Sequence, residues 1–297
     1  MSPPKRTIVI TGCSDGGLGA ALALTFHKTS QWRILATARN PAKLTACTAA
    51  GIETLTLDVL SPESITAAVA QVASLTNGTL DCILHNAGAG FTMPLMDVDV
   101  SKARDLFDLN VWSILSVTQA FLPLLRAAAP GAMVVINTSG SATPAGMLPF
   151  AGVYNASKAA AMGLAETMRL ELEVFGIRTV NLVTGAVRTN FGVNRVVEPK
   201  LPQSSMYVQA GVGDLVEGVM DNEELTAKGA DAMVWAEEVV RKLSGRKPAY
   251  WIWAGGFTTV LRIAGNFPVG MWDFVMKRVM GVTKVEETIR RGKEKRV

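Results

Sequence analysis

The first 254 residues alternate between short apolar runs and longer segments that have the composition and starting residues of helices. The apolar runs are rich in Val, Ile, Leu and Thr, which is typical of strands buried on both faces. This alternation predicts right-handed crossovers and a doubly wound α/β fold, in which helices cover both faces of a parallel sheet. The predicted strands are residues 7–11, 33–39, 53–57, 80–85, 133–137, 177–183 and 249–254.

Polar or small residues stand at the ends of five of these runs. They are Gly12, Arg39, Asp58, Asn86 and Ser141. Because the carboxyl ends of parallel strands meet at one rim of the sheet, these residues converge there, and ligands of open α/β sheets bind at that rim. We therefore expect the functional site at this rim.

A glycine-rich loop, residues 12–19 (GCSDGGLG), joins the first strand to an Ala- and Leu-rich helical segment. A strand, a glycine-rich loop and a helix in this order favour a dinucleotide-binding loop. Glycines let the backbone approach a pyrophosphate, whose charge then lies at the positive N-terminus of the helix. The alternative is a tight turn that binds no ligand.

The same loop contains a G-x-S-x-G pattern with Ser14 at its centre. This pattern also occurs at the strand-to-helix turn of serine hydrolases, which need a histidine and an acid downstream. His27 and His85 are the two histidines of the chain, and neither has the late position expected of a hydrolase histidine. These positions argue against acyl hydrolysis from Ser14, which we keep as an alternative. With two histidines in the chain, a His-rich metal centre is excluded.

Residues that follow the next three strands favour particular cofactor contacts. Arg39 suits the 2′-phosphate of NADP, whereas NAD calls for an acidic residue at this place. Asp58 lies where its carboxylate can accept a hydrogen bond from the adenine amine. Small residues after Asn86 let the backbone pass close to the cofactor. These positions predict NADP rather than NAD.

Tyr154 and Lys158 lie four positions apart in a segment predicted to be helical. Residues with this spacing share one helix face, so the phenol and the ammonium point into the same space. A neighbouring cation favours phenolate and is expected to lower the pKa of Tyr154 from about 10. The spacing suggests an acid/base pair, although an unrelated exposed pair has the same spacing.

Composition narrows the function classes. Charged residues make up 18% of the chain, below the usual ~25%, and hydrophobic residues make up 49%. Burial of a parallel sheet on both faces explains part of this apolar character, and an apolar substrate or membrane surface explains more. A net charge of +4 without a basic cluster between aromatics argues against nucleic-acid binding. Three cysteines without metal-type spacing indicate a reducing compartment.

Taken together, the motifs resemble those of the short-chain dehydrogenase/reductase family over residues 5–254. The glycine loop, an N-A-G segment at Asn86 and a Y-x-x-x-K pair match the family in order and spacing. Ser141, 13 positions before Tyr154, matches the family's catalytic serine, and Asn110 matches its helical asparagine. The resemblance implies a single-domain Rossmann fold with seven parallel strands over residues 1–254, and NADPH/NADP+ as the cofactor.

The resemblance also implies a role for each site residue. Tyr154 is expected to supply the proton, and Ser141 to hydrogen-bond the carbonyl oxygen, with Ser139 as its competitor. Lys158 is expected to hold the ribose and lower the Tyr154 pKa, and Asn110 to position a water. The implied catalytic residues are Asn110, Ser141, Tyr154 and Lys158. The implied cofactor-binding residues are Gly12, Ser14, Gly17, Leu18, Gly19, Arg39, Asp58, Val59, Asn86, Ala87, Gly88, Tyr154, Lys158, Val187 and Thr189.

Three departures from the family pattern stand out. The glycine loop is one residue longer than the commonest form, so Gly12 and residues 17–19 are better contact candidates than Gly16. His85 replaces the first asparagine of the usual N-N-A-G. After the sixth strand, the usual P-G becomes Thr184-Gly185, which puts the rigidity of that turn in doubt, and Thr189 is expected to bind the nicotinamide amide.

The second half of the chain contains two segments without a clear strand or helix pattern. Residues 190–222 are interrupted by Gly and Pro, and the resemblance implies a lid over the substrate. Residues 255–297 form a C-terminal apolar helical extension, with two short amphipathic helices expected over 257–282 and a basic tail. Its internal charges argue against a spanning helix and favour an anchor on an anionic membrane or lipid droplet. The alternative is packing on the sheet edge or on a second subunit.

This extension, the glycine loop and Arg39 make the chain most similar to the fungal 1-acyldihydroxyacetone-phosphate reductase branch. We therefore predict an NADPH-dependent ketoreductase that acts on a small lipophilic carbonyl compound, whether acyl-dihydroxyacetone-phosphate-like, steroid-like or a polyketide or other secondary metabolite. The predicted location is cytoplasmic and peripheral on the endoplasmic reticulum or lipid droplets, as a homo-oligomer. The alternatives are the hydrolase and a non-catalytic lipid-surface protein.

Overall fold

Seven parallel strands form one sheet in the order β3-β2-β1-β4-β5-β6-β9. The computed structural model describes residues 5–29, 31–221, 227–268 and 270–294. The strands are β1 (Arg6–Ile10), β2 (Trp32–Ala38), β3 (Glu53–Thr56), β4 (Cys82–His85), β5 (Met133–Asn137), β6 (Arg178–Thr184) and β9 (Trp251–Ala254). The predicted seven-stranded parallel sheet is confirmed.

Helices cover both faces of the sheet, as predicted. Successive residues of β1 point to opposite faces, so that Ile8 and Ile10 enter one hydrophobic core and Val9 enters the other. The first core contains side chains of α1 (Leu18–Lys28), α2 (Thr45–Ala49) and α10 (Ala232–Leu243), and the second contains side chains of α3 (Pro62–Leu75), α5 (Ser113–Ala128) and α6 (Gly152–Glu173).

The long helical segment before β5 changes from α-helical to π-helical geometry around Asn110. α4 (Val100–Phe107) continues through a π-helical turn (Asp108–Trp112) into α5, which passes through Pro123. Pro123 lies inside α5 and does not end it. A π turn inside a helix often marks a functional position.

The same segment, Val100–Ala128, is the one helix in the described residues that is long and apolar enough to cross a membrane by length and composition. Its residues Val117, Phe121 and Leu125 are fully buried against the sheet. Its apolar face therefore belongs to the protein core.

Short elements complete the turns between strands and helices. Residues 222–226 lie outside the described residues. α10 begins at Ala232, where Asp231 Oδ1 accepts a hydrogen bond from the Met233 amide (2.9 Å). The shorter elements are η1 (Pro41–Lys43), η2 (Leu95–Asp97), η4 (Gly140–Ala142), η5 (Pro144–Gly146), η6 (Asn190–Val193), α7 (Met206–Gln209), α8 (Gly213–Asp221) and the paired strands β7 (Val187–Arg188) and β8 (Ala230–Asp231).

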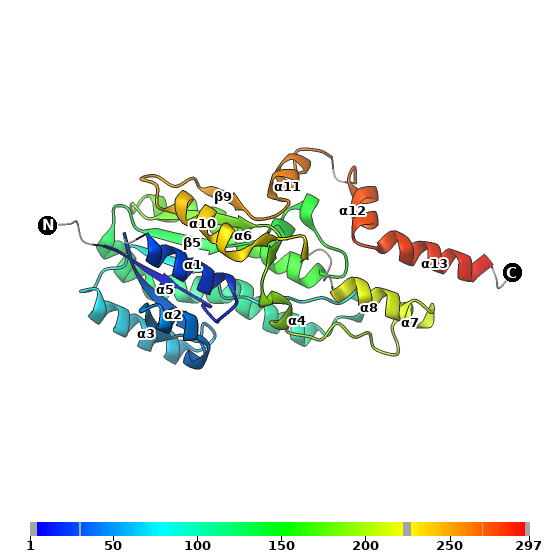
Figure 1. Ribbon diagram of the computed structural model, residues 1–297, viewed down its shortest axis with the longest axis horizontal. Coiled ribbons are helices and arrows are strands. Elements are labelled where there is room, and N and C mark those ends of the chain that lie inside the picture. The colour runs from blue at the N-terminus through cyan, green and yellow to red at the C-terminus, as the bar shows by residue number, and fades with distance from the viewer. Residues whose placement is uncertain (1–4, 30, 222–226, 269, 295–297) are drawn as a thin grey trace.

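The C-terminal extension forms three helices, α11 (Thr258–Ala264), α12 (Asp273–Val279) and α13 (Val282–Glu294). The first two match the two short helices expected over 257–282, and α13 was not predicted. Val285 of α13 is buried, and α13 packs against α8. α7, α8 and α13 lie together at the end of the molecule opposite the N-terminus (Figure 1).

Candidate functional site

The glycine loop leaves no room for side chains at two of its positions. Gly12 has a positive φ of 72°, and a Cβ atom there would lie 2.8 Å from the Cα atom of Ala87. A Cβ atom on Gly19 would lie 2.4 Å from the carbonyl oxygen of Gly12. The loop is held by Asn86, whose Nδ2 donates to the carbonyl oxygens of Thr11 and Gly12 (3.0 Å each). The loop can therefore come close to a ligand along its backbone.

The first turn of α1 is open to an anion. Gly17 is the N-cap residue and makes no side-chain cap, and the first turn of α1 contains no acidic residue. Its free backbone N–H groups and the helix dipole together favour a phosphate group. This geometry fits the pyrophosphate of a dinucleotide at Gly17, Leu18 and Gly19.

Gly16, the extra residue of the loop, faces the segment after β6. Its carbonyl oxygen accepts a hydrogen bond from the Asn190 amide (3.2 Å), and its φ is +74°. Ser14 Oγ is half-buried, and its backbone oxygen accepts from the Gly17 amide (3.1 Å). The lid segment, defined here as residues 190–221, therefore begins directly over the loop.

Arg39 and Asp58 follow the ends of β2 and β3 at the same rim. Arg39 is exposed, and within the part of the chain that the structure describes its guanidinium lies in no ion pair. Asp58 Oδ1 accepts from the Leu60 amide (3.0 Å), and Val59 beside it is buried. The exposed guanidinium can thus meet a phosphate group at the edge of the site.

Asn110, in the π turn, joins three elements. Its Oδ1 accepts from the Ala89 amide (3.0 Å), and its Nδ2 donates to the Ala89 carbonyl oxygen and to Ser157 Oγ (3.1 Å each). A Cβ atom on Gly88 would lie 3.0 Å from Asn110 Oδ1 and 3.7 Å from Lys158 Nζ. Asn110 therefore holds the segment after β4 against α6, next to Lys158.

Lys158 is buried, and its Nζ donates to the backbone oxygen of Asn137 (3.1 Å). Burial lowers the pKa of Lys158 to about 8. Asn137 also donates to Asn86 Oδ1 (3.0 Å) and accepts from Thr184 Oγ1 (2.6 Å). Sequence reasoning missed Asn137, although an asparagine that ends an apolar strand at the rim was a usable signal.

Tyr154 lies between Lys158 and the turn after β5. Lys158 Nζ is 5.9 Å from the centre of the Tyr154 ring. Burial raises the pKa of Tyr154, and a hydrogen bond with Ser139 acts in the opposite direction. The direction differs from the lower pKa expected from the spacing, because desolvation dominates and the Lys158 ammonium is directed to Asn137.

Both candidate serines lie in this turn. Ser139 caps η4 and accepts from the Ser141 amide (3.2 Å). Ser141 is buried, and its Oγ donates to Ser139 Oγ (2.9 Å). The structure thus places both serines in the turn that precedes the helix of Tyr154, and the hydroxyl of Ser139 opposes the rise in the Tyr154 pKa.

The turn after β6 is held by hydrogen bonds and close packing in place of the usual proline. Thr184 Oγ1 donates to Asn137 Oδ1, and a Cβ atom on Gly185 would lie 2.1 Å from the Gly256 carbonyl oxygen. Val187 is partly buried and packs against the core that contains side chains of α1 and α10. Thr189 Oγ1 accepts from the Phe191 amide (3.2 Å) at the start of the lid segment.

Tyr154 packs beside apolar side chains of the lid segment and of neighbouring segments. The Phe191 ring lies edge-on to the Tyr154 ring, with 5.8 Å between their centres. Phe150 and Tyr207 form a second edge-on pair nearby (5.7 Å). We call this group the lid cluster; its buried members are Ala89, Phe91, Met93, Leu106, Val153, Leu201, Val212, Val216, Met220 and Val285. The side of the rim next to Tyr154 is therefore apolar.

Neither histidine supports the hydrolase alternative. His85 is buried, its Nε2 contacts Thr118 Oγ1 (2.9 Å), and burial lowers its pKa to about 3. His27 is exposed in the last turn of α1, whereas Ser14 precedes the first turn. The three cysteines are free and buried, and the described residues contain no cluster that could hold a metal ion.

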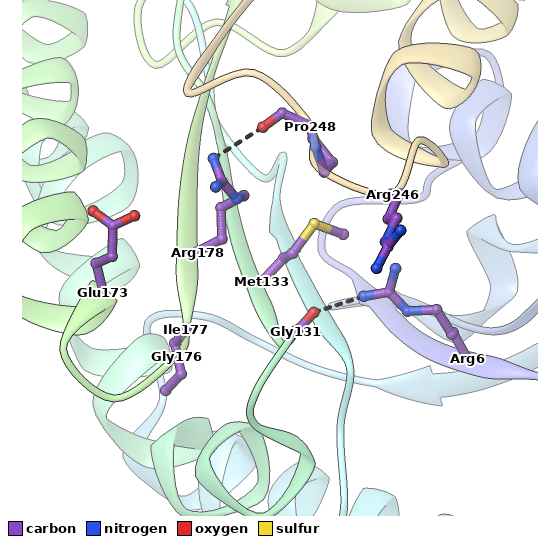
Figure 2. Close-up of a pocket in the computed structure, with 9 residues that line it drawn as sticks. All are labelled: Arg6, Gly131, Met133, Glu173, Gly176, Ile177, Arg178, Arg246 and Pro248. Atoms are coloured by element: carbon purple, nitrogen blue, oxygen red, sulfur yellow. Dashed lines mark hydrogen bonds between the residues drawn. The ribbon is translucent and has the colours of Figure 1, made fainter.

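A cavity of about 330 Å³ opens at the opposite end of the sheet, at the amino ends of β1, β5 and β6 (Figure 2). Figure 2 shows that two of its three arginines already contact the protein: Arg6 donates to the Gly131 carbonyl oxygen (2.8 Å) and Arg178 to that of Pro248 (3.0 Å). The candidate residues lie at the other rim, so this cavity is not part of the candidate site.

Comparison with known proteins gives one family. The sequence model described as short chain dehydrogenase matches residues 6–199. The chain is 41% identical over 292 residues to a short-chain dehydrogenase/reductase from Pestalotiopsis microspora, covering 98% of this chain and 99% of the relative.

Two further matches cover nearly the whole chain. An NADPH-dependent 1-acyldihydroxyacetone phosphate reductase from Schizosaccharomyces pombe is 31% identical over 291 residues, or 93% of this chain and 94% of the relative. The crystal structure of a short-chain dehydrogenase from Streptomyces avermitilis superposes with a TM-score of 0.73 at 25% identity, over 96% of this chain and 98% of the other. The family model ends at residue 199, but these matches continue into the C-terminal extension.

Proposed function

Because the chain belongs to the short-chain dehydrogenase/reductase family, we propose that it is an NADPH-dependent ketoreductase that acts on a lipophilic carbonyl compound. The observation that carries this proposal is one rim at which Tyr154, Lys158 and the serine pair face both the glycine loop and the lid cluster. The two sides of the site suit a polar dinucleotide and an apolar substrate.

The residues at the rim fit a nicotinamide dinucleotide. The tight backbone at Gly12 and Gly19 and the open N-terminus of α1 would hold the pyrophosphate, and exposed Arg39 would hold the 2′-phosphate. The NADPH-dependent relative supports this choice. When bound, NADPH would supply the hydride that reduces the carbonyl carbon.

Side chains of the protein would donate the proton and stabilise the carbonyl oxygen. Tyr154 would donate its phenolic proton to the carbonyl oxygen as negative charge develops there, and a serine hydroxyl from the turn after β5 would stabilise that oxygen. Ser141 is the serine with the family spacing. Lys158, oriented by the Asn137 carbonyl oxygen, would bind the ribose hydroxyls, and Asn110 would anchor this side of the site and position a water.

The lid cluster supports a lipophilic substrate. Its walls are aliphatic and aromatic, and they begin at the Tyr154 ring itself. An acyl-dihydroxyacetone-phosphate-like compound fits because it joins an acyl chain to a ketone, and the Schizosaccharomyces pombe relative acts on such a compound by name. Steroid-like and polyketide ketones have the same apolar character.

Turnover of NADPH with a panel of these three ketone classes tests the function. We expect Tyr154→Phe to lower kcat at least about a thousandfold, because the phenolic proton is lost. Tyr250→Phe is the matched control: its hydroxyl bonds Glu173 at the opposite end of the sheet, so activity should be unchanged. An active Tyr154→Phe enzyme would contradict the proton role, and failure to bind NADPH or NADH would favour a non-catalytic lipid-surface protein.

The location and assembly are part of the same proposal. Exposed apolar side chains on α11 and α12 support peripheral attachment to the cytoplasmic face of the endoplasmic reticulum or to lipid droplets. Leu170, Val174 and Phe175 at the end of α6 are exposed as well, which supports a homo-oligomer that covers them.

A further inference from the structure

The cavity at the amino ends of β1, β5 and β6 brings three arginines together (Figure 2). Arg6, Arg178 and Arg246 line it, and Glu173 is the acidic residue among the lining residues, so their side chains leave a net charge of +2. Figure 2 shows that Arg246 extends toward the Arg6 guanidinium, with Glu173 on the other side of the cavity. A concave surface with charges of one sign attracts ions of the opposite sign. The cavity therefore favours an anion.

Aromatic rings hold two of these arginines in place. The guanidinium carbon of Arg6 lies 4.5 Å from the centre of the Trp32 ring, and that of Arg178 lies 4.3 Å from the centre of the Tyr250 ring. Each of the two also donates one hydrogen bond to a backbone carbonyl oxygen (2.8 and 3.0 Å). Because a guanidinium has several N–H donors, most of them stay available to a ligand. The two groups are thus oriented before any ligand binds, which lowers the entropy cost of binding.

Nearby carboxylates leave most of this positive charge uncompensated. The Arg6 Nε atom lies 3.9 Å from Asp81 Oδ1, which is beyond hydrogen-bond distance. Glu173 accepts a hydrogen bond from an aromatic hydroxyl. Across the residues that the structure describes, neither Arg178 nor Arg246 forms an ion pair. An anion in the cavity would therefore compensate charge that the protein itself does not.

We propose that this cavity is a second ligand site, separate from the reductase site, and that it binds the phosphate group of a small phosphorylated compound. A phosphate monoester carries up to two negative charges and three free oxygens, whereas a carboxylate has one charge and two oxygens. Three guanidinium groups with a net charge of +2 around them match the phosphate better, and arginine binds phosphate through paired N–H groups. The volume of about 330 Å³ leaves room for an organic part beside the phosphate.

A phosphate in this cavity would connect three segments that are distant in the sequence. Arg6 is the first residue of β1, Arg178 is the first residue of β6, and Arg246 lies in the loop between α10 and β9. A ligand that binds only the folded chain stabilises that chain by mass action. Phosphate should therefore raise the Tm. It should do so without contact to the reacting groups, which lie at the other rim of the sheet.

Calorimetric titration of the full chain with inorganic phosphate tests the site. We expect saturable binding that Arg246→Ala weakens about tenfold or more, as for loss of a charge-assisted contact. Arg246 is exposed, so this variant should fold normally. Arg104→Ala removes an equally exposed arginine from α4, beside the lid cluster, and should leave the affinity within about twofold. Sodium chloride at the same ionic strength should not reproduce the rise in Tm.

Arg39→Ala separates this cavity from the rim proposed to bind NADPH, which also suits phosphate. Phosphate binding that is lost in Arg39→Ala and intact in Arg246→Ala would place the anion at that rim and refute the second site. An equal rise in Tm with chloride would refute it as well.

Glycerol 3-phosphate and vesicles that contain phosphatidic acid distinguish the two sources of the phosphate group. Weaker binding of glycerol 3-phosphate to Arg246→Ala than to the wild type supports a soluble ligand, and a loss confined to the vesicles supports a lipid head group. If Arg246→Ala binds inorganic phosphate, glycerol 3-phosphate and the vesicles as the wild type does, the cavity is not a phosphate site.

Discussion

The Rossmann body, residues 6–254, buries most of its large apolar side chains, whereas the C-terminal extension, residues 255–294, exposes most of its own. Phe26, Phe121 and Trp235 of the body are at most 1% exposed, but Phe257 and Phe274 of the extension are 45% and 70% exposed. Eight of the 21 exposed large apolar side chains in the described residues fall between 257 and 279. A stretch of this length with so many exposed apolar groups has no core of its own to fill.

The polar groups of the two regions differ in the same way. In the body, Asn86, Asn110 and Asn137 each make several hydrogen bonds between strand ends, which fixes the rim. In the extension, Arg262, Lys277 and Arg278 are exposed beside the apolar side chains. The body is therefore built to hold reacting groups in place, and the extension has the composition of a docking surface for an apolar, anionic partner.

Lys158→Met should cause the largest loss of activity. It tests whether a buried lysine that the reaction needs makes the body less stable. We expect kcat to fall by about a thousandfold, because the ammonium that supports Tyr154 and the ribose is lost. Lys102→Met on the surface of α4, whose ammonium pairs with Asp105, is the control and should keep full activity. Steady-state kinetics of NADPH oxidation measure both variants.

Stability should change in the opposite direction to activity. Because burial lowers the Lys158 pKa from 10.5 to about 8, the charged form is penalised in the folded state by about 3 kcal/mol, an upper bound for the gain of Lys158→Met below pH 8. Between pH 8 and pH 10.5 the unfolded state binds more protons than the folded state. The free energy of unfolding of the wild type therefore rises with pH in this window, and the stability advantage of Lys158→Met disappears. Urea unfolding at several pH values tests this, and a Met variant less stable at every pH would contradict it.

Arg39→Asp should have the next largest effect and tests the cofactor side of the body. We expect NADPH affinity to fall about tenfold to a hundredfold more than NADH affinity, since a charge-assisted contact to the 2′-phosphate is replaced by repulsion. Arg241→Asp makes the same charge change at an exposed position of α10 and should alter neither. Equal losses for both cofactors, measured by fluorescence titration, would argue against NADP preference.

The sheet was predictable because burial on both faces leaves an apolar run for every strand. The glycine loop was predictable because Gly12 and Gly19 face backbone atoms at distances that no side chain permits. α13 was not, because its sequence is largely polar and its place depends on Val285 and Ile289 packing on the lid cluster. An isolated sequence pattern does not show such a distant partner.

In the candidate site as well, contacts between distant residues could not be predicted from the sequence. Spacing from Tyr154 singled out Ser141, but it could not show that the Ser141 hydroxyl bonds the Ser139 hydroxyl in the turn around Gly140. Asn137 was missed because its side chain and carbonyl oxygen bond residues from three other segments. The direction of the Tyr154 pKa depends on burial, which an i, i+4 spacing does not contain.

Phe274→Asp should have the smallest effect on stability and activity, and it tests whether the extension binds membranes. The side chain is 70% exposed, so we expect the free energy of unfolding to change by no more than about 0.5 kcal/mol and kcat with a soluble ketone to be unchanged. Binding to phosphatidylserine vesicles should fall about tenfold or more, because insertion of this aromatic ring is worth about 1.5–3 kcal/mol. Vesicle sedimentation measures the binding.

Val234→Asp is the control that makes the vesicle experiment specific to the extension. Val234 is 61% exposed in α10 of the body, so its replacement introduces the same charge without touching α11 or α12, and vesicle binding should stay at the wild-type level. Equal losses in both variants would reflect only the added negative charge. If Phe274→Asp instead changes the mass in solution and leaves vesicle binding intact, a second copy of the chain covers this surface, and the difference between body and extension concerns assembly and not lipid.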